Sequence, residues 1–142
     1  MNIVVGVTSR PESKVALERA IEEAQLRRAH LVMVRTMGEG LSENPAQNQT
    51  WAKKIDAART EGEELVARLA ARGIEAEHRV ESVSRDAASV LLRIADDVNA
   101  ELLVIGLRRR SPVGKLVLGS VSQDVLLGAQ CPVLAVKSAP DG

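Results

Sequence analysis

Aromatic side chains are almost absent from this sequence of 142 residues, which contains one tryptophan, Trp51, and neither phenylalanine nor tyrosine. Valine, leucine, isoleucine and alanine must therefore fill the hydrophobic core. Proteins that bind single-stranded nucleic acid stack bases on several aromatic side chains. Because the 19 basic residues are balanced by 19 acidic ones, the chain also lacks the positive field that attracts a polyanion. We therefore expect no nucleic-acid partner.

Metal-binding and disulfide-forming residues are equally scarce. Cys131 is the single cysteine, which excludes an internal disulfide, and the two histidines, His30 and His78, provide no cluster of zinc ligands. No arrangement of residues in the sequence indicates a nucleophile with its base. We therefore expect no metal site and no catalytic residues, and a binding function is favoured over an enzymatic one.

Long apolar runs are missing as well. No segment approaches the roughly 20 apolar residues that cross a bilayer. The sequence begins with a short apolar run, residues 3–7, and not with the basic, apolar and small-residue zones of a secretion signal. These features predict a cytoplasmic protein without membrane contact. The length is typical of one domain, expected over residues 1–138, with a short tail at residues 139–142.

Apolar and charged segments alternate along the chain. Five short apolar runs have the composition of strands that are covered on both faces. Four longer segments place apolar residues at helical spacing or are rich in alanine, leucine and glutamate. The expected strands are residues 3–7, 30–35, 75–80, 102–105 and 132–137, and the expected helices are residues 9–28, 51–72, 84–99 and 120–127. This alternation predicts an α/β fold, a doubly wound five-stranded parallel sheet with four helices.

Particular residues are expected to mark the ends of these helices. Ser9 begins a Ser-x-x-Glu capping box, and Ser84 and Asp86 suit the start of the third helix. Gly73 suits the position just after the second helix, where a left-handed backbone is common. Residues 38–50, rich in glycine, asparagine, glutamine and serine, are expected to form a mobile loop.

The segment between the fourth strand and the fourth helix is rich in glycine and arginine. It ends in Gly119 and Ser120, at the start of the expected helix at residues 120–127. Free backbone N–H groups at a helix start and nearby hydroxyls can bind a phosphate. The spacing of Ser120 and Gln123 also fits a simple capping box, which would need no ligand. A Walker-type phosphate loop is excluded, because Arg109 and Leu116 stand where that motif has glycine and serine or threonine.

Four segments together resemble the universal stress protein family over nearly the whole chain. They are residues 3–7, 102–106, 106–120 and 131–136. The resemblance implies the strand order 3-2-1-4-5 for the parallel sheet. It also implies a homodimer that forms through the fifth strand, at Val133, Leu134, Ala135 and Val136. One branch of the family binds ATP without a Walker loop.

The ATP-binding branch carries the motif Gly-x2-Gly-x9-Gly-(Ser/Thr). Gly106, Gly119 and Ser120 match it, but Arg109 occupies the second glycine position and Thr8 stands where the branch has an aspartate after the first strand. The Thr8 hydroxyl can still accept a hydrogen bond, and a guanidinium can pair with phosphate. The arginine side chain, however, fills space that glycine leaves open.

The resemblance implies a regulatory module for stress adaptation that binds ATP or another adenine nucleotide, with or without Mg²⁺. The residues expected to border the base and the ribose are Val5, Gly6, Val7, Thr8, Arg35 and Thr36. Those expected at the phosphates are Gly106, Arg108, Arg109, Gly119, Ser120, Val121 and Ser122. Two alternatives remain open. One is a dimeric interaction domain that binds no nucleotide, which Thr8 and Arg109 favour, and the other is a slow nucleotide hydrolase.

Overall fold

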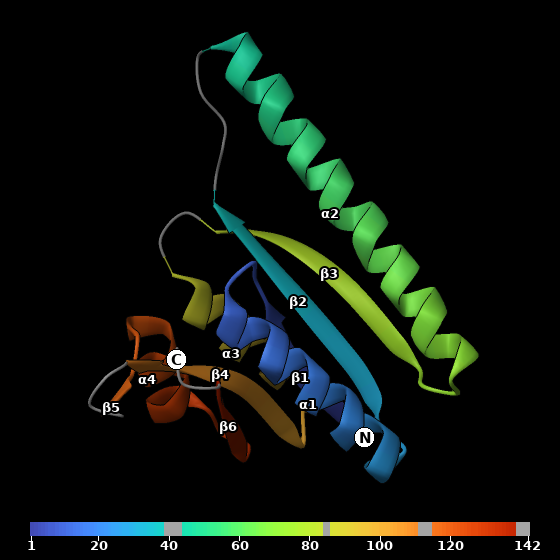
Figure 1. The fold of residues 1–142 in the computed structure, drawn as a ribbon, viewed down its shortest axis with the longest axis vertical. Helices are drawn as coiled ribbons and strands as arrows, with labels where there is room; N and C mark the ends of the chain where they lie inside the picture. The colour runs from blue at the N-terminus through green and yellow to red at the C-terminus, as the bar shows by residue number, and fades with distance from the viewer. Residues whose placement is uncertain (39–43, 84–85, 111–114, 139–142) are drawn as a thin grey trace.

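A parallel sheet of five strands forms the centre of the computed structural model, which describes residues 1–38, 44–83, 86–110 and 115–138 (Figure 1). The strands are β1 (Asn2–Val7), β2 (His30–Gly38), β3 (Ala76–Val83), β4 (Leu102–Arg110) and β6 (Val133–Lys137), with a short antiparallel strand, β5 (Lys115–Val117), paired to the end of β4. The helices are α1 (Pro11–Arg27), α2 (Pro45–Ala71), α3 (Ala87–Asp97) and α4 (Ser120–Gly128). The parallel strands lie in the order β3-β2-β1-β4-β6. The predicted α/β fold with the order 3-2-1-4-5 is therefore confirmed.

The central strand β1 separates the two halves of the sheet. On one side it pairs with β2 from Asn2↔His30 to Val7↔Arg35, and on the other it pairs with β4, which the chain reaches only after α3. The chain thus leaves the carboxyl ends of β1 and β4 in different directions. In a doubly wound sheet this point is where ligands bind.

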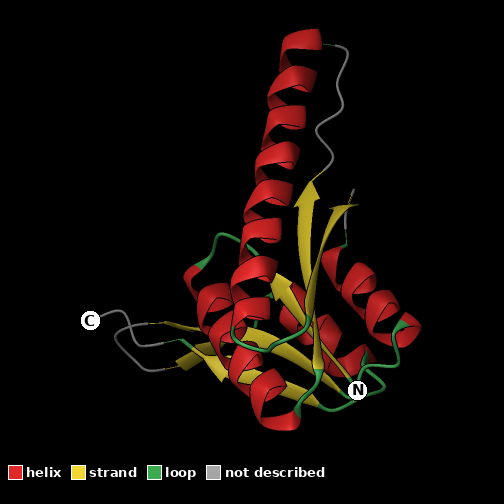
Figure 2. Ribbon diagram, turned by 90° about the vertical axis from the view of Figure 1, so that its right-hand side faces the viewer, coloured by secondary structure: helices red, strands yellow, loops and turns green. Residues whose placement is uncertain are grey.

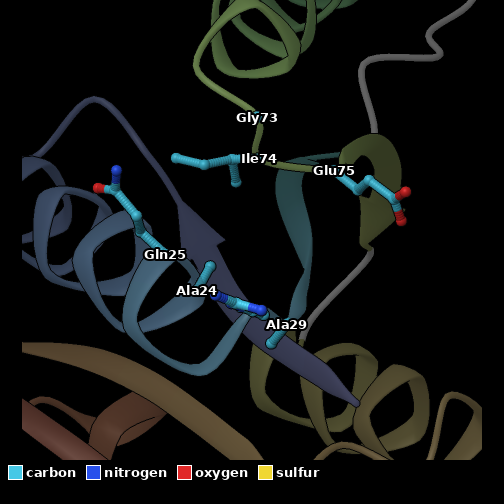
Figure 3. A pocket seen from close by; sticks show the side chains of 7 residues that line it. Ala24, Gln25, Ala29, Gly73, Ile74 and Glu75 are labelled. Atoms are coloured by element: carbon cyan, nitrogen blue, oxygen red, sulfur yellow. The ribbon is translucent and has the colours of Figure 1, made fainter.

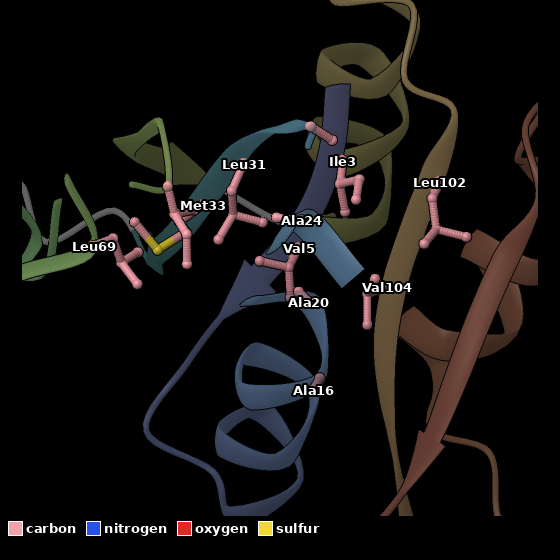
Figure 4. Packing of buried hydrophobic residues seen from close by; sticks show 12 residues of the cluster. Ile3, Val5, Ala16, Ala20, Ala24, Leu31, Met33, Leu69, Leu102 and Val104 are labelled. Carbon is pink, nitrogen blue, oxygen red and sulfur yellow. The ribbon is translucent and has the colours of Figure 1, made fainter. Parts of the chain in front are cut away.

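Two apolar layers hold the helices against the sheet. In the layer beneath α1 and α2, Ala16, Ala20 and Ala24 recur every four residues, so that one alanine face of α1 lies against the strands (Figure 4). Small side chains let this helix approach the sheet closely. The larger members of the layer come from the strands and from α2, and include Ile3, Val5, Leu31, Met33 and Leu69. The second layer joins α3 and α4 to the opposite face.

The helix α2 extends well beyond the sheet (Figures 1 and 2). Its buried residues begin only at Ile55. Closer to its start, the indole N–H of Trp51 donates a hydrogen bond of 2.8 Å to the carbonyl of Gly38, the last residue of β2. This bond ties the projecting part of the helix to the end of that strand.

The start of α2 corrects the expected loop at residues 38–50. The helix begins at Pro45, and the side chain of Asn44 caps it by accepting a hydrogen bond of 3.0 Å from the N–H of Ala46. Asparagine at the cap and proline at the first position are strong start signals, which the polar composition of the segment conceals. Residues 39–43 lie outside the described part of the chain.

Three helices end in the same way. Arg28, Gly73 and Asn99, each just after a helix, have left-handed backbones with φ of 54°, 80° and 51°. In each case the following residue donates its N–H to a carbonyl five positions earlier: Ala29 to Ala24, Ile74 to Leu69, and Ala100 to Ala95. This is the Schellman motif, and the prediction for Gly73 is confirmed.

Two further expectations about helix starts and strand ends are wrong. Ser9 does not cap α1, because the N-cap residue is Arg10, without a side-chain bond, and Pro11 follows it. The fourth parallel strand does not end at residue 105, since β4 continues to Arg110 and pairs there with β5.

The expected start of α3 is confirmed at Asp86, whose side chain caps the helix by accepting a hydrogen bond from the N–H of Ser89. Ser84 lies outside the described residues.

Candidate functional site

A cavity of about 270 Å³ lies at the carboxyl ends of β1 and β4. Its position is the point where the chain leaves the sheet in two directions. Six of the residues expected at the nucleotide line it: Gly6, Thr8, Thr36, Gly106, Val121 and Ser122. The other lining residues, Arg10, Glu12, Ser13, Ala87, Leu91, Val104 and Ile105, did not emerge from the sequence as site residues.

The remaining expected residues lie elsewhere. Val5 is fully buried in the core. Val7 and Arg35 line a neighbouring cavity of about 400 Å³ beside α2, where Arg35 forms an ion pair of 3.0 Å with Glu61. Three other expected phosphate residues are outside the lining of the 270 Å³ cavity: Arg108 is exposed on β4, and Gly119 and Ser120 are exposed at the start of α4. The backbone of Arg109 belongs to β4, and its side chain is outside the described part of the structure.

Hydrogen bonds shape the loop between β1 and α1, which forms one wall of the cavity. Ser13 is 7% exposed, and its hydroxyl accepts a bond of 2.7 Å from the N–H of Thr8 and donates one of 3.4 Å to the carbonyl of Gly6. The hydroxyl of Thr8 in turn accepts a bond of 3.2 Å from the N–H of Arg10. The Thr8 hydroxyl is therefore already engaged in a hydrogen bond within the loop. The Ser13 hydroxyl joins two points of the loop, the carbonyl of Gly6 and the N–H of Thr8.

Gly106 and Gly119 both match the family motif, but only one of them is required by the packing of the described residues. A Cβ on Gly106 would lie 2.1 Å from the carbonyl oxygen of Glu12, so glycine is needed there to let α1 approach β4. A Cβ on Gly119 would meet open space, and its φ of −64° suits any residue. Packing within the described residues thus explains Gly106 and leaves Gly119 without an internal role.

The first turn of α4 forms the opposite wall. Gly119 is the N-cap residue and makes no side-chain bond, so the expectation that Ser120 caps the helix is wrong. Val121 and Ser122 line the cavity, and the hydroxyl of Ser122 donates a weak bond of 3.5 Å to the carbonyl of Gly106. The first N–H groups of a helix have no partner within it and attract anions.

Two charged side chains are found among the described residues that line the cavity, Arg10 and Glu12. Among the described residues neither of them forms an ion pair or a side-chain hydrogen bond. Beside α2, burial lowers the pKa of His78, and the charge of Arg35 lowers it further while Glu61 opposes the change.

As far as the structure describes it, the lining of the cavity contains hydroxyl groups but no histidine or cysteine that could activate one of them. The described ranges contain no group of three histidine, cysteine or acidic residues that could hold a metal ion. Within the same ranges, no helix combines the length and the apolar character needed to cross a membrane.

A larger cavity lies at the other end of the molecule. Its volume is about 410 Å³, and it is formed where α1 and α2 end (Figure 3). The residues that line it are Ala24, Gln25, Arg28, Ala29, Gly73, Ile74 and Glu75. None of the residues expected at the nucleotide is among those that line it. The cavity is formed by the two Schellman turns at Arg28 and Gly73.

Comparisons with known proteins point to one family. A model of the universal stress protein family matches residues 1–137. A universal stress protein of Mycolicibacterium smegmatis is 40% identical over 135 residues, which cover 95% of this chain and 96% of the relative.

Two solved structures have the same fold. A universal stress protein from Archaeoglobus fulgidus is 33% identical, with a TM-score of 0.73 and coverage of 96% of this chain and 98% of that one. A universal stress protein from the same organism, solved in complex with dAMP, is 27% identical, with a TM-score of 0.67 and the same coverage.

Proposed function

The chain belongs to the universal stress protein family, and we propose that it binds an adenine nucleotide in the 270 Å³ cavity as a regulatory signal. The observation that carries the proposal is the position of this cavity at the carboxyl ends of β1 and β4, with six of the expected residues around it. The complex of a 27% identical relative with dAMP supports the same ligand class.

The two walls of the cavity offer different chemistry. Leu91, Val104 and Ile105 provide an apolar surface suited to a base, and the hydroxyl of Thr36 is available to a sugar. On the other wall, the first turn of α4 offers N–H groups and the Ser122 hydroxyl to a phosphate. Gly119 fits this role, since its lack of a side chain serves no contact within the described residues.

The loop motif of the sequence favours ATP, with or without Mg²⁺. The described part of the lining contributes one carboxylate, Glu12, so a Mg²⁺ ion would be held mainly by the phosphates of the nucleotide and not by a set of protein ligands. A binding module is favoured over a hydrolase, because the described residues of the lining include no histidine and no paired nucleophile and base.

A homodimer through β6 is the second part of the proposal. Among the described strands β6 pairs only with β4, so one edge of this apolar strand is open to another chain. The helix that precedes it, α4, exposes Leu126 and Leu127, which are 40% and 79% exposed. A second copy related by a two-fold axis would cover both features.

Titration calorimetry with adenosine, AMP and ATP tests the nucleotide site. We expect saturable binding, with Ser122→Ala weakening the nucleotides by about three- to ten-fold through the loss of one hydrogen bond. Leu26→Ala is a suitable control, because this exposed residue of α1 is not in the lining of the cavity. Absence of heat and of a thermal shift at millimolar concentrations of all three compounds would leave the interaction domain as the better hypothesis.

A further inference from the structure

We propose that the outer edge of β3 binds an extended peptide of another protein as an added antiparallel strand. The peptide lies in a groove of about 440 Å³ between β3 and α2, and carries an acidic, a basic and an apolar side chain at every second position. This groove and the nucleotide cavity share no lining residue, so the inference is independent of the proposed function.

The backbone of β3 has unpaired hydrogen-bonding groups on its outer edge. Among the described strands, β3 pairs only with β2. The N–H of Leu31 in β2 bonds to the carbonyl of Glu75, and because these groups alternate in direction along a strand, the odd-numbered residues of β3 turn theirs to β2. The N–H and carbonyl groups of His78 and Val80 therefore point away from the sheet, and they bond to no other described residue. An extended peptide can pair with such an edge.

The helix α2 limits what can pair with this edge. It runs alongside β3 in the opposite direction (Figure 1). Arg59, Glu63 and Val66 of α2 line one wall of the groove, and β3 forms the other. A groove between a helix and a strand edge has room for one extended chain, and every second side chain of that chain faces the helix.

The contact between Gly62 and His78 sets the register of the two walls, because the imidazole ring packs against the glycine. A helix rises about 1.5 Å and a strand about 3.3 Å per residue. Since the two elements run in opposite directions, Glu63 is level with His78, and Arg59 is about 4.5 Å further along, near Val80.

The two charged residues of the α2 wall are available to a partner. Arg59 and Glu63 are exposed, and neither forms an ion pair with another described residue. Glu77 also lines the groove, but its carboxylate is engaged: it accepts a hydrogen bond of 2.9 Å from Arg79 and lies 3.1 Å from Nε2 of His30. The selective charges of the groove are therefore those of the helix.

This register defines the charges of the peptide. In an antiparallel pair, the residues opposite Val80 and His78 are two positions apart and have their side chains on the α2 face. The first meets Arg59 and should be acidic, and the second meets Glu63 and should be basic.

Val66 and Ala76 add one apolar position, two residues further along the peptide. The complete pattern, read towards the carboxyl end, is acidic-x-basic-x-apolar. In this chain it occurs once, at residues 12–16, which belong to the helix α1. The partner is therefore a different protein and not a second copy.

Fluorescence anisotropy with a labelled peptide, Thr-Asp-Thr-Lys-Thr-Val-Thr, tests the proposal on the full chain. The matched peptide is Thr-Lys-Thr-Asp-Thr-Val-Thr, which exchanges the two charges. We expect saturable binding of the first peptide and at least about five-fold weaker binding of the second. N-methylation of the Asp and Lys residues should abolish binding, because their N–H groups bond to β3. N-methylation of the Thr between them should not, since its N–H points away.

Exchange of the charges on the protein gives a test that unfolding cannot imitate. Arg59→Glu combined with Glu63→Arg should invert the preference, so that the second peptide binds more tightly. The control is Glu64→Arg combined with Arg68→Glu, which exchanges two charges one turn apart in the neighbouring 400 Å³ cavity, outside this groove. It should keep the original preference.

Four outcomes would overturn the proposal. They are no binding of either peptide at millimolar concentration, equal binding of the two, binding that is insensitive to N-methylation of Asp and Lys, and an exchanged variant that does not invert the preference.

Discussion

Gly62 of α2 and His78 of β3 occupy one shared space: a Cβ built on residue 62 would lie 2.1 Å from Nδ1 and 2.3 Å from Cγ of the imidazole ring. Gly62 is buried near the middle of a helix of 27 residues, where glycine lowers helix stability. Packing therefore requires glycine at position 62, since the ring of His78 fills the space that a side chain would occupy.

Gly62→Ala should destabilise the protein by about 1–3 kcal/mol, because the ring is displaced close to its root and cannot simply rotate away. In a His78→Ala background the same change should stabilise the protein by about 0.5–1 kcal/mol, because alanine favours the helix and the clash is gone. Urea unfolding of the four proteins measures this double-mutant cycle. The same sign in both backgrounds would argue against the contact.

Acidification should weaken the fold through His78. Burial and Arg35 lower the pKa of His78 from its ordinary 6.5, so the unfolded chain binds this proton more readily than the folded one. The stabilising contribution is present above pH 6.5 and is lost as the pH falls below it. Melting temperatures between pH 8 and pH 5.5 should decrease more for the unmodified protein than for His78→Gln. Parallel curves for the two proteins would remove His78 from this role.

The three Schellman turns provide a test of backbone strain. Arg28 has a left-handed φ of 54°, in the position that Gly73 occupies after α2. Arg28→Gly should stabilise the protein by about 0.5–1 kcal/mol because it relieves this strain. Gly73→Ala should cost about 1 kcal/mol, although a Cβ there would meet nothing within 4 Å. Chemical denaturation measures both, and a loss of stability in Arg28→Gly would show that its side chain contributes more than its backbone costs.

The buried hydroxyl of Ser13 should be important both for stability and for binding. Ser13→Ala leaves the N–H of Thr8 without its partner at 2.7 Å, which should cost about 1–3 kcal/mol. Ser13→Thr restores the hydroxyl and should recover part of the AMP affinity. Calorimetry and thermal unfolding, carried out together, separate the two effects. Full AMP affinity in folded Ser13→Ala would show that the loop does not need this bond to form the site.

The dimer proposal predicts a mass of twice 15.2 kDa at micromolar concentration, measured by light scattering. Ala135→Pro, which removes a backbone donor from β6, should shift the protein towards the monomer. Ala76→Pro is the matched control, since it changes the first residue of β3 at the opposite edge of the sheet. A monomeric mass of the unmodified protein would contradict the proposal and leave the nucleotide site unaffected.

The sheet could be predicted because its strands are continuous apolar runs, such as Ile3, Val4 and Val5, that are buried completely. The end of β4 could not, since Arg108 and its neighbours have the composition of a loop and become a strand only by pairing with β5. The start of α2 was hidden for a related reason. Capping residues such as Asn44 are also turn residues, and only the helix that follows distinguishes the two uses.

The residues that line the cavity could be predicted from the sequence only in part. Gly106 and Ser122 belong to a recognisable segment before and within α4, so their spacing in the sequence identified them as candidate site residues. Arg10, Glu12 and Ser13 follow β1 and carry no comparable pattern. Their place in the site depends on the Ser13 hydroxyl closing the loop over Gly6 and on α1 approaching β4 at Gly106, and both are tertiary contacts.

The bond between Trp51 and Gly38 gives the protein an intrinsic optical reporter. Because the chain has one tryptophan and neither tyrosine nor phenylalanine, all intrinsic emission comes from this one position. The emission therefore reports on the projecting part of α2 and its contact with the end of β2, two residues beyond Thr36 in the cavity wall. Compared with circular dichroism, which follows all the helices, it distinguishes detachment of this segment from unfolding of the whole chain.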